Sequence, residues 1–362
     1  MKKMSYYISA AASMVLALAM TAPLQSCSNE DNAAAANEEL HTPKLVIKEV
    51  NVGGGFTRND NGRAYNFAKA ITLYNNARSV GTLTNLAIGM LPPPNSNSTN
   101  DNLDEDGNLV YENTDWVPVL TAIWYIPSIS VKPYQDIVIA VNGAIDHTQI
   151  ASDAFSLADS KYYAMYDPES GFNMASYYPA PDASIPTANY WKAAVYGAGT
   201  AWLLSMNSPN LVLFQIPEGV DIDAYCADEA NRYYEGGEAD AWKSNYCVKV
   251  PKSWIIDAME TQRIGYEEKN VKRLPADIDA GFVPYVNLKG YSAYRNVDEA
   301  ATKAIKGNAD KLVYDYDQAV EGTEEPSGID AAASIKNGAT IIYQDTNNSS
   351  ADFHLRKAWS LK

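Results

Sequence analysis

The sequence predicts a mainly β protein built as a β-sandwich, with a few short helices. Runs of β-branched and aromatic residues recur between residues 45 and 216, and such runs are typical of strands. Glycine, proline and asparagine residues end these runs, which is the usual composition of turns. Few helical patterns separate the runs, and this argues against the regular strand–helix alternation of a parallel sheet.

The expected strands, in chain order, are residues 45–50, 69–74, 83–90, 116–126, 137–141 and 210–216. The first run, Leu-Val-Ile-Lys-Glu-Val, ends at the three glycines 53–55, and the third ends at the prolines 92–94. Pro118 interrupts the fourth run.

Three later stretches have helical character. Residues 220–235 space Ile222, Tyr225 and other large side chains at helical intervals before a Gly-Gly stop. Residues 298–307 predict another short helix. The stretch 254–260 follows a proline and fits a short helix or a buried strand equally well.

Two insertions separate the expected strands. Residues 95–113 are polar and rich in Asn and Asp, whereas residues 151–208 carry many Tyr and Trp residues. Loops of this length are usually functional or disordered, and the second contains too many aromatic residues for disorder.

Several segments carry a family resemblance. Residues 45–50, followed by A-I-T-L-Y-N-N at 70–76, resemble the opening of lamin-tail-like Ig β-sandwiches, although Thr72 stands where that family usually has Glu. The segment D-T-N-N-S-S-A-D-F at 345–353 resembles the closing segment of a group of Bacteroidota lipoproteins that form a domain family of unknown function. Residues 291–295, Y-S-A-Y-R, resemble their S-x-x-R strand. The resemblance covers roughly residues 45–362 and implies an Ig-like, lamin-tail-like β-sandwich at the cell envelope, often beside outer-membrane nutrient-uptake machinery.

The N-terminus predicts secretion and lipid attachment. Two lysines precede a short apolar run, so residues 1–26 are expected to be a signal peptide rather than a membrane span. The sequence Leu-Gln-Ser-Cys at 24–27 resembles a bacterial lipobox, which makes Cys27 the expected site of acylation. Residues 28–31 resemble the acidic tag of surface-displayed lipoproteins. Residues 27–43 are then a lipidated tether, and residues 44–362 form the folded domain on the outer membrane, facing the cell surface.

Charge and cysteine usage narrow the possibilities further. The formal net charge of −16 leaves no basic surface for nucleic acid. With Cys27 lipidated, Cys226 and Cys247 remain as an even pair in an oxidising compartment. We expect a disulfide between them, worth about 3 kcal/mol in the chain-entropy model. The alternative is two separately buried thiols.

The sharpest local motif lies in the first insertion. Asn102, Asp104, Asp106 and Asn108 surround Gly107 with the oxygen spacing of a calcium loop. Position 12 of such a loop is an Asn instead of the usual Glu, so a solvated acidic hairpin tip is the alternative. No other cofactor is expected.

The second insertion supplies candidate ligand-binding rings at Tyr163, Tyr178, Trp191 and Trp202. Aromatic side chains give a flat ligand a large contact area at small entropic cost. Alternatively, the same rings pack the long insertion onto the sandwich.

The predicted function is non-catalytic. The sequence lacks G-x-S-x-G, H-E-x-x-H and P-loop motifs, and His147 and His354 are expected to be packing or surface residues, which leaves no expected catalytic residue. We expect a surface lipoprotein that binds a nutrient or assists outer-membrane uptake, with a TonB-dependent transporter or another envelope protein as partner. The alternatives are a structural or adhesive module and a hydrolase that uses carboxylates.

Overall fold

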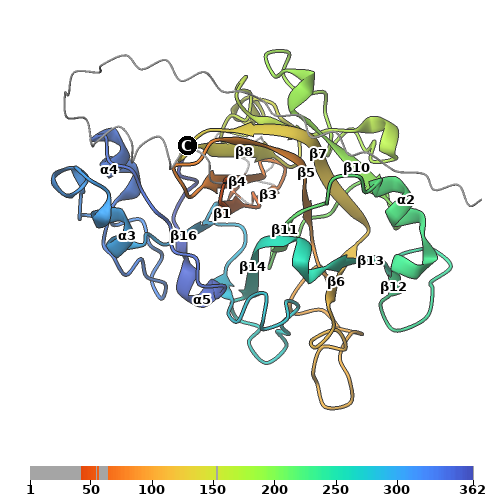
Figure 1. The fold of residues 1–362 in the computed structure, drawn as a ribbon. Coiled ribbons are helices and arrows are strands. Elements are labelled where there is room, and N and C mark those ends of the chain that lie inside the picture. Colours follow the sequence, from red (N-terminus) through yellow and green to blue (C-terminus); the bar gives the residue numbers. More distant parts are fainter. Residues whose placement is uncertain (1–41, 54, 57–63, 152–153, 362) are drawn as a thin grey trace, which may run out of the picture. The chain divides into compact units, whose positions relative to one another are not determined.

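The computed structural model describes residues 42–361, apart from residues 54, 57–63 and 152–153 (Figure 1). These described residues form one compact unit. The predicted signal peptide, Cys27 and nearly all of the predicted tether lie outside the described residues. In the described part of the chain, none of the helices is long and apolar enough to cross a membrane.

The prediction of a mainly β fold is confirmed, but the prediction of an Ig-like, lamin-tail-like β-sandwich is wrong. One sheet of twelve strands dominates the fold, and its two edge strands contact each other, so that the sheet curls into a nearly closed barrel. In sheet order the strands are β15 (Val283–Tyr285), β14 (Ile255–Arg263), β11 (Asn210–Gln215), β5 (Gly81–Gly89), β7 (Ala122–Val131), β10 (Tyr190–Val195), β9 (Tyr163–Met165), β8 (Asp136–Ala140), β4 (Ala70–Asn75), β1 (Leu45–Asn51), β16 (Ser292–Arg295) and β17 (Phe353–Arg356).

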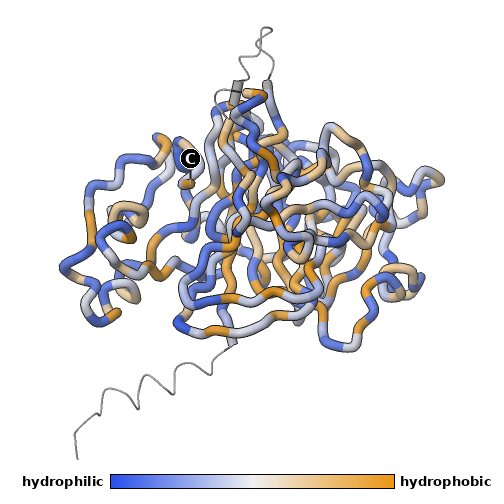
Figure 2. The backbone as a smooth tube through the Cα atoms, turned by 90° about the horizontal axis from the view of Figure 1, so that it is seen from above, coloured by the Kyte–Doolittle hydropathy of each residue, from blue (hydrophilic) through white to orange (hydrophobic). Residues whose placement is uncertain are grey.

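Burial on both faces of the first strands explains this difference. Every residue of β1 and β4 is buried, whereas a two-layer sandwich usually leaves one face of each strand partly exposed. Ile71 and Leu73 point into the main core inside the barrel, and Tyr74 packs outside it with Tyr294 and Tyr343. Figure 2 shows the hydrophobic stretches gathered at the middle of the molecule, with hydrophilic loops around them.

The long insertion 151–208 is an integral part of the barrel. Its strands β9 and β10 lie between β7 and β8, and β9 pairs in parallel with both β8 and β10. Trp191 and Trp202 therefore pack in the barrel core and do not lie on a separate surface loop.

The expected strand 116–126 is divided in two. Strand β6 (Trp116–Leu120) pairs with β13 (Tyr246–Pro251), which also pairs with β12 (Arg232–Tyr234), while β7 belongs to the barrel. Thr121 separates β6 from β7 with a φ of 69°. Gly197 packs against this break, because a Cβ there would lie 2.7 Å from the Thr121 Cα. A hairpin of β2 (Gly55–Phe56) and β3 (Ala64–Tyr65) completes the strands that the structure describes.

The helices are short, and three of the four α-helices that the structure describes begin at a capping aspartate. They are α2 (Ile222–Ala227), α3 (Glu299–Ala304), α4 (Ala331–Lys336) and α5 (Ser349–Asp352), with 3-10 turns η1 (His147–Gln149), η2 (Pro168–Ser170), η3 (Thr187–Asn189), η4 (Glu229–Asn231), η5 (Lys252–Trp254) and η6 (Ala309–Lys311). Asp221, Asp298 and Asp330 each accept a hydrogen bond from a backbone N–H of the first turn. The expected helix 298–307 is thus confirmed in α3. The stretch 220–235 contains α2 and η4 before it continues as β12, and residues 255–260 belong to the strand β14.

The segment that contains α3 and α4 follows β16 and covers the outer face of β1 and β16, where Val297, Ile329 and Ile341 pack on Val46 and Tyr294 (Figure 1). Two ion pairs are buried in the fold. Arg295 of β16 binds the Asp257 carboxylate of β14 and the Ile47 carbonyl of β1. The Arg273 guanidinium lies 2.7 Å from Glu260, and neither side chain is exposed. The S-x-x-R motif at 292–295 therefore serves the fold.

Candidate ligand-binding site

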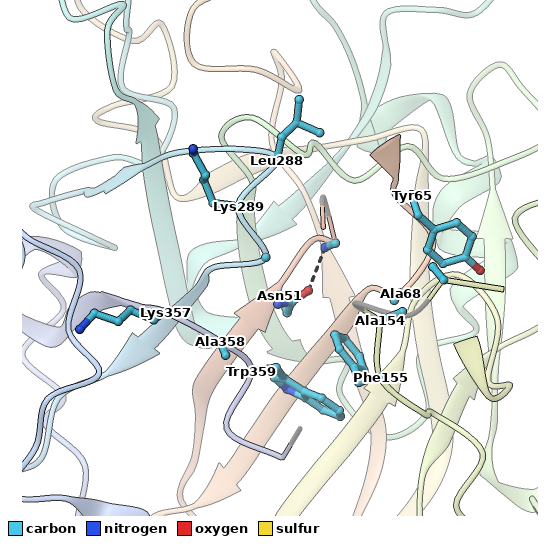
Figure 3. Close-up of a pocket in the computed structure, with 13 residues that line it drawn as sticks. Asn51, Tyr65, Ala68, Ala154, Phe155, Leu288, Lys289, Lys357, Ala358 and Trp359 are labelled. Atoms are coloured by element: carbon cyan, nitrogen blue, oxygen red, sulfur yellow. Dashed lines mark hydrogen bonds between the residues drawn. The ribbon is translucent and has the colours of Figure 1, made fainter. Parts of the chain in front are cut away.

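A pocket of about 300 Å³ lies on the outer face of the sheet, where β1 ends and β4 begins (Figure 3). Asn51 and Ala68 contribute from these strand ends, and the loop 288–290 forms another wall. Ala151, Ala154 and Phe155 complete the lining together with residues 357–359. The pocket therefore depends on parts of the chain that are far apart in sequence.

An aromatic wall borders the pocket. The rings of Phe155 and Trp359 lie with their centroids 4.1 Å apart and their planes inclined by 35°, and Tyr162 meets the Trp359 ring edge-on. Figure 3 shows the two rings next to each other, with Leu288 and Lys289 across from them. Because Phe155 and Trp359 are 7% and 2% exposed, their orientation is fixed by packing before any ligand arrives.

One buried polar group of the pocket lining has no hydrogen-bond partner among the described residues. It is the indole Nε1 of Trp359. The indole N–H groups of Trp124, Trp191 and Trp202 in the barrel core also lack a partner, and of these four Trp359 is the one that lines the pocket. Buried polar groups are normally paired, so a ligand in the pocket has this donor to satisfy.

The Tyr65 ring lines the pocket, and its hydroxyl is held by His147. His147 Nε2 lies 2.7 Å from the Gly143 carbonyl, which only accepts, so this nitrogen carries the proton. Nδ1 then accepts from the Tyr65 hydroxyl, 2.7 Å away. Burial lowers the pKa of His147 and raises the pKa of Tyr65 to about 12, so both groups are neutral near pH 7.

Lysines are the charged residues of the pocket. Lys289 is exposed at the mouth, and the Lys357 amine extends away to the Asp317 carbonyl at 2.6 Å. None of the thirteen described lining residues is acidic. Asn51 uses its side-chain oxygen to accept from the Gly53 N–H at 2.8 Å.

The ligand-binding rings predicted from sequence lie elsewhere. Tyr178, Trp191 and Trp202 are buried in the barrel core, and Tyr163 is half-buried against it. The Tyr178 hydroxyl accepts from the Trp202 backbone N–H at 2.9 Å. These three buried rings therefore pack the fold and present no open face to a ligand.

The predicted calcium loop forms a hairpin tip. Leu103 and Leu109 pair across it, and the Asp104 carboxylate accepts from the backbone N–H groups of Asp106 and Asn108. The Asn102 side chain is buried and binds Glu235 and Tyr233 outside the loop. Among the described residues, no three His, Cys, Asp or Glu side chains form a metal-binding group.

The predicted disulfide does not form. Cys226 and Cys247 are both free, buried thiols, and they pack in different hydrophobic clusters. Burial raises the pKa of the Cys226 thiol to about 12, so it stays protonated and unreactive. The alternative of two separately buried thiols describes the structure.

The residues that build the pocket carry no sequence motif. Phe155 is one aromatic residue among many in the second insertion, and Trp359 lies close to the C-terminus without a motif around it. No local signal connects two residues so far apart.

Comparison with known proteins agrees with this fold. No curated protein matches the chain. The crystal structure of a DUF4876 family protein from Bacteroides thetaiotaomicron VPI-5482 is similar, with a TM-score of 0.60 and 20% sequence identity, over 87% of this chain and 71% of that one. The family model described as "Protein of unknown function (DUF4876)" matches residues 132–360, well over half of the sequence. The chain therefore belongs to the DUF4876 family.

Proposed function

We propose that this protein is a non-catalytic binding protein that takes a small molecule into the pocket between Phe155, Trp359 and the loop 288–290. The observation that carries the proposal is the pre-arranged aromatic wall beside an unpartnered, buried indole N–H. A volume of about 300 Å³ is at the lower end of the range for small-molecule sites.

The proposed cellular setting is the outer membrane, with the domain held there by a lipid on Cys27. This part of the proposal rests on the lipobox-like sequence at 24–27 and on the resemblance to Bacteroidota lipoproteins. Capture of a nutrient for a neighbouring transporter is the role that suits a binding protein in this place. Intact-mass analysis of wild type and Cys27→Ser tests the anchor: only wild type should carry a lipid mass and fractionate with membranes.

The binding function is tested with a neutral flat probe, N-phenyl-1-naphthylamine, whose fluorescence rises in apolar sites. Ala154→Trp fills the pocket, because Ala154 lines it and is half-buried. Ala183→Trp places the same side chain on an exposed loop and serves as the matched control.

We expect wild type and Ala183→Trp to bind the probe equally, and Ala154→Trp to bind it at least ten-fold more weakly. The melting temperatures of the three proteins show that each is folded. Equal probe binding by folded Ala154→Trp would overturn the proposal.

A structural or adhesive role is the second candidate, and one feature favours it. Trp242 is 83% exposed at the tip of the loop between β12 and β13. Asp240 braces this loop by accepting from the Trp242 N–H at 3.0 Å and from the Ser244 hydroxyl. A rigidly presented, exposed tryptophan is typical of a contact residue. Loss of a cell-surface contact in Trp242→Ala, with probe binding intact, would support this candidate.

A further inference from the structure

The pocket has a charge unlike that of the rest of the chain. The whole sequence has a formal charge of −16, yet the described lining contains two lysines and no acidic residue. The Arg356 guanidinium also donates to the carbonyl of Ala358 in the lining. These cations create a locally positive potential that favours a negatively charged ligand.

The neighbouring carboxylates lie outside the pocket lining. Glu49, two residues before Asn51 on β1, is buried and accepts from the Ser292 hydroxyl and from the Ser360 backbone N–H, 2.9 Å away. Its carboxylate is therefore held by these two serines and does not face the pocket. Asp317 meets Lys357 through its backbone carbonyl and is exposed.

The unpartnered indole N–H defines a hydrogen bond that a ligand must complete. An indole N–H can only donate, so Trp359 requires an acceptor atom from the ligand. An acceptor that carries charge forms the stronger hydrogen bond in a site sheltered from water.

The shape of the wall defines the rest of the ligand. Phe155 and Trp359 present fixed rings, and the lining beside them includes the small side chains of Ala68, Ala151 and Ala154. Small side chains leave space along the rings, so a planar apolar body makes the best contact.

We propose that the pocket binds a small aromatic carboxylate, whose ring lies along Phe155 and Trp359 and whose carboxylate meets the Trp359 N–H and the Lys289 amine. This inference rests on the proposed binding function and specifies its ligand class. Lys289 acts from the mouth of the pocket, where its exposed side chain is free to reach an anionic group.

The test uses ligands that share one body and differ in charge. 2-Naphthoate, 2-naphthamide and 2-naphthylmethylamine compete with N-phenyl-1-naphthylamine for the full-length protein. We expect the carboxylate to bind at least ten-fold more tightly than the amide and the amine to bind most weakly. The preference should shrink as salt screens the lysine charge.

Three variants locate the source of the preference. Lys289→Glu should reduce the preference for carboxylate over amide to less than two-fold, a ratio measured on the same variant. Lys336→Glu makes the same charge change on exposed α4 and should leave the preference intact. Trp359→Phe retains an aromatic ring but removes the N–H, so it should weaken the carboxylate at least five-fold relative to the probe.

The outcomes separate the two proposals. Equal displacement of the probe by carboxylate and amide would overturn the ligand class and leave the binding function standing. A ten-fold preference that survives Lys289→Glu would overturn the role of Lys289 and of the mouth charge. A probe that does not bind the wild-type pocket would overturn the binding function and the ligand class together.

Discussion

The hydroxyl of Tyr316 donates a hydrogen bond to Nε2 of His354, and the two atoms lie 2.6 Å apart. His354 Nδ1 lies 2.7 Å from the side-chain oxygen of Asn296, which accepts the proton of this nitrogen. The imidazole is therefore neutral, fully buried on β17, and paired at both nitrogens. Protonation would replace the acceptor that Tyr316 needs with a second donor.

This relationship predicts acid sensitivity. Burial lowers the pKa of His354 to about 3, so the unfolded chain takes up a proton near pH 6.5 while the folded chain does not. Stability is then lost as the pH falls from about 6.5 toward 3. Between pH 7 and pH 4, the stability advantage of wild type over His354→Gln should shrink by about 3 kcal/mol, as measured by urea unfolding. Tyr316→Phe retains the titrating imidazole, so its stability should depend on pH as that of wild type does. If the stability difference between wild type and His354→Gln is the same at pH 7 and pH 4, His354 does not cause the acid sensitivity.

A buried lysine predicts a gain of stability in alkali, with the same sign of pH dependence as His354. The Lys69 amine is almost fully buried and donates to the Leu204 carbonyl at 2.8 Å. Burial lowers its pKa to about 8, so the unfolded chain binds the proton more tightly and stability rises from pH 8 to about pH 10.

Relative to Lys69→Met, wild type should gain about 3 kcal/mol between pH 7 and pH 10.5. The comparison cancels the tyrosines and cysteines that also titrate in this range. Lys192→Met, at an exposed position of β10, should show no such difference. If the difference in free energy of unfolding between wild type and Lys69→Met does not change with pH, the Lys69 amine keeps its ordinary pKa.

The strands could be predicted from sequence because their signal is local. Val46, Ile47 and Val50 identify β1 through β-branched runs, and Pro118 marks β6, which is an edge strand of the small sheet. The order of strands could not be predicted in this way. Glu49 binds Ser360 across 311 residues, and no periodic pattern encodes such a pairing. Strands of a closed sheet and of a sandwich have the same local composition.

The site escaped prediction for the same reason. The sequence alone does not distinguish an aromatic residue of the core from one that lines a pocket. Trp191 and Trp359 differ in the residues that the fold places beside them. Trp191 packs inside the barrel, whereas Trp359 closes the outer face of β4 and β8 with Phe155.

The free thiols predict resistance to reducing agents. Because Cys226 and Cys247 are unbonded, dithiothreitol should leave the melting temperature unchanged within about 1 °C. A disulfide closing this loop would stabilise the fold by about 3 kcal/mol, which corresponds to several degrees. Scanning calorimetry with and without reductant decides between the two, and Cys226→Ala provides a protein in which no bond can form. A reductant-dependent melting temperature in wild type alone would contradict the structure.

The buried ion pair of Arg273 and Glu260 predicts that removing only the arginine destabilises the fold more than removing both partners. The Arg273 guanidinium also donates to the backbone carbonyls of Ser208 and Thr261, at 2.9 and 2.7 Å, so it joins β14 to the segment before β11. Arg273→Met strands the Glu260 carboxylate in the core and should lower the free energy of unfolding by about 3–5 kcal/mol.

The exposed pair of Lys303 and Glu299, 2.6 Å apart on α3, is the matched control. Lys303→Met should change stability by less than about 0.5 kcal/mol, because solvent screens the interaction. Replacing both partners, as Arg273→Met with Glu260→Met, removes the stranded charge and should recover part of the loss. Urea unfolding measures all four proteins. If Arg273→Met and Lys303→Met lower the free energy of unfolding equally, water reaches Glu260. The close packing of β14 against the loop that carries Arg273 would then be wrong.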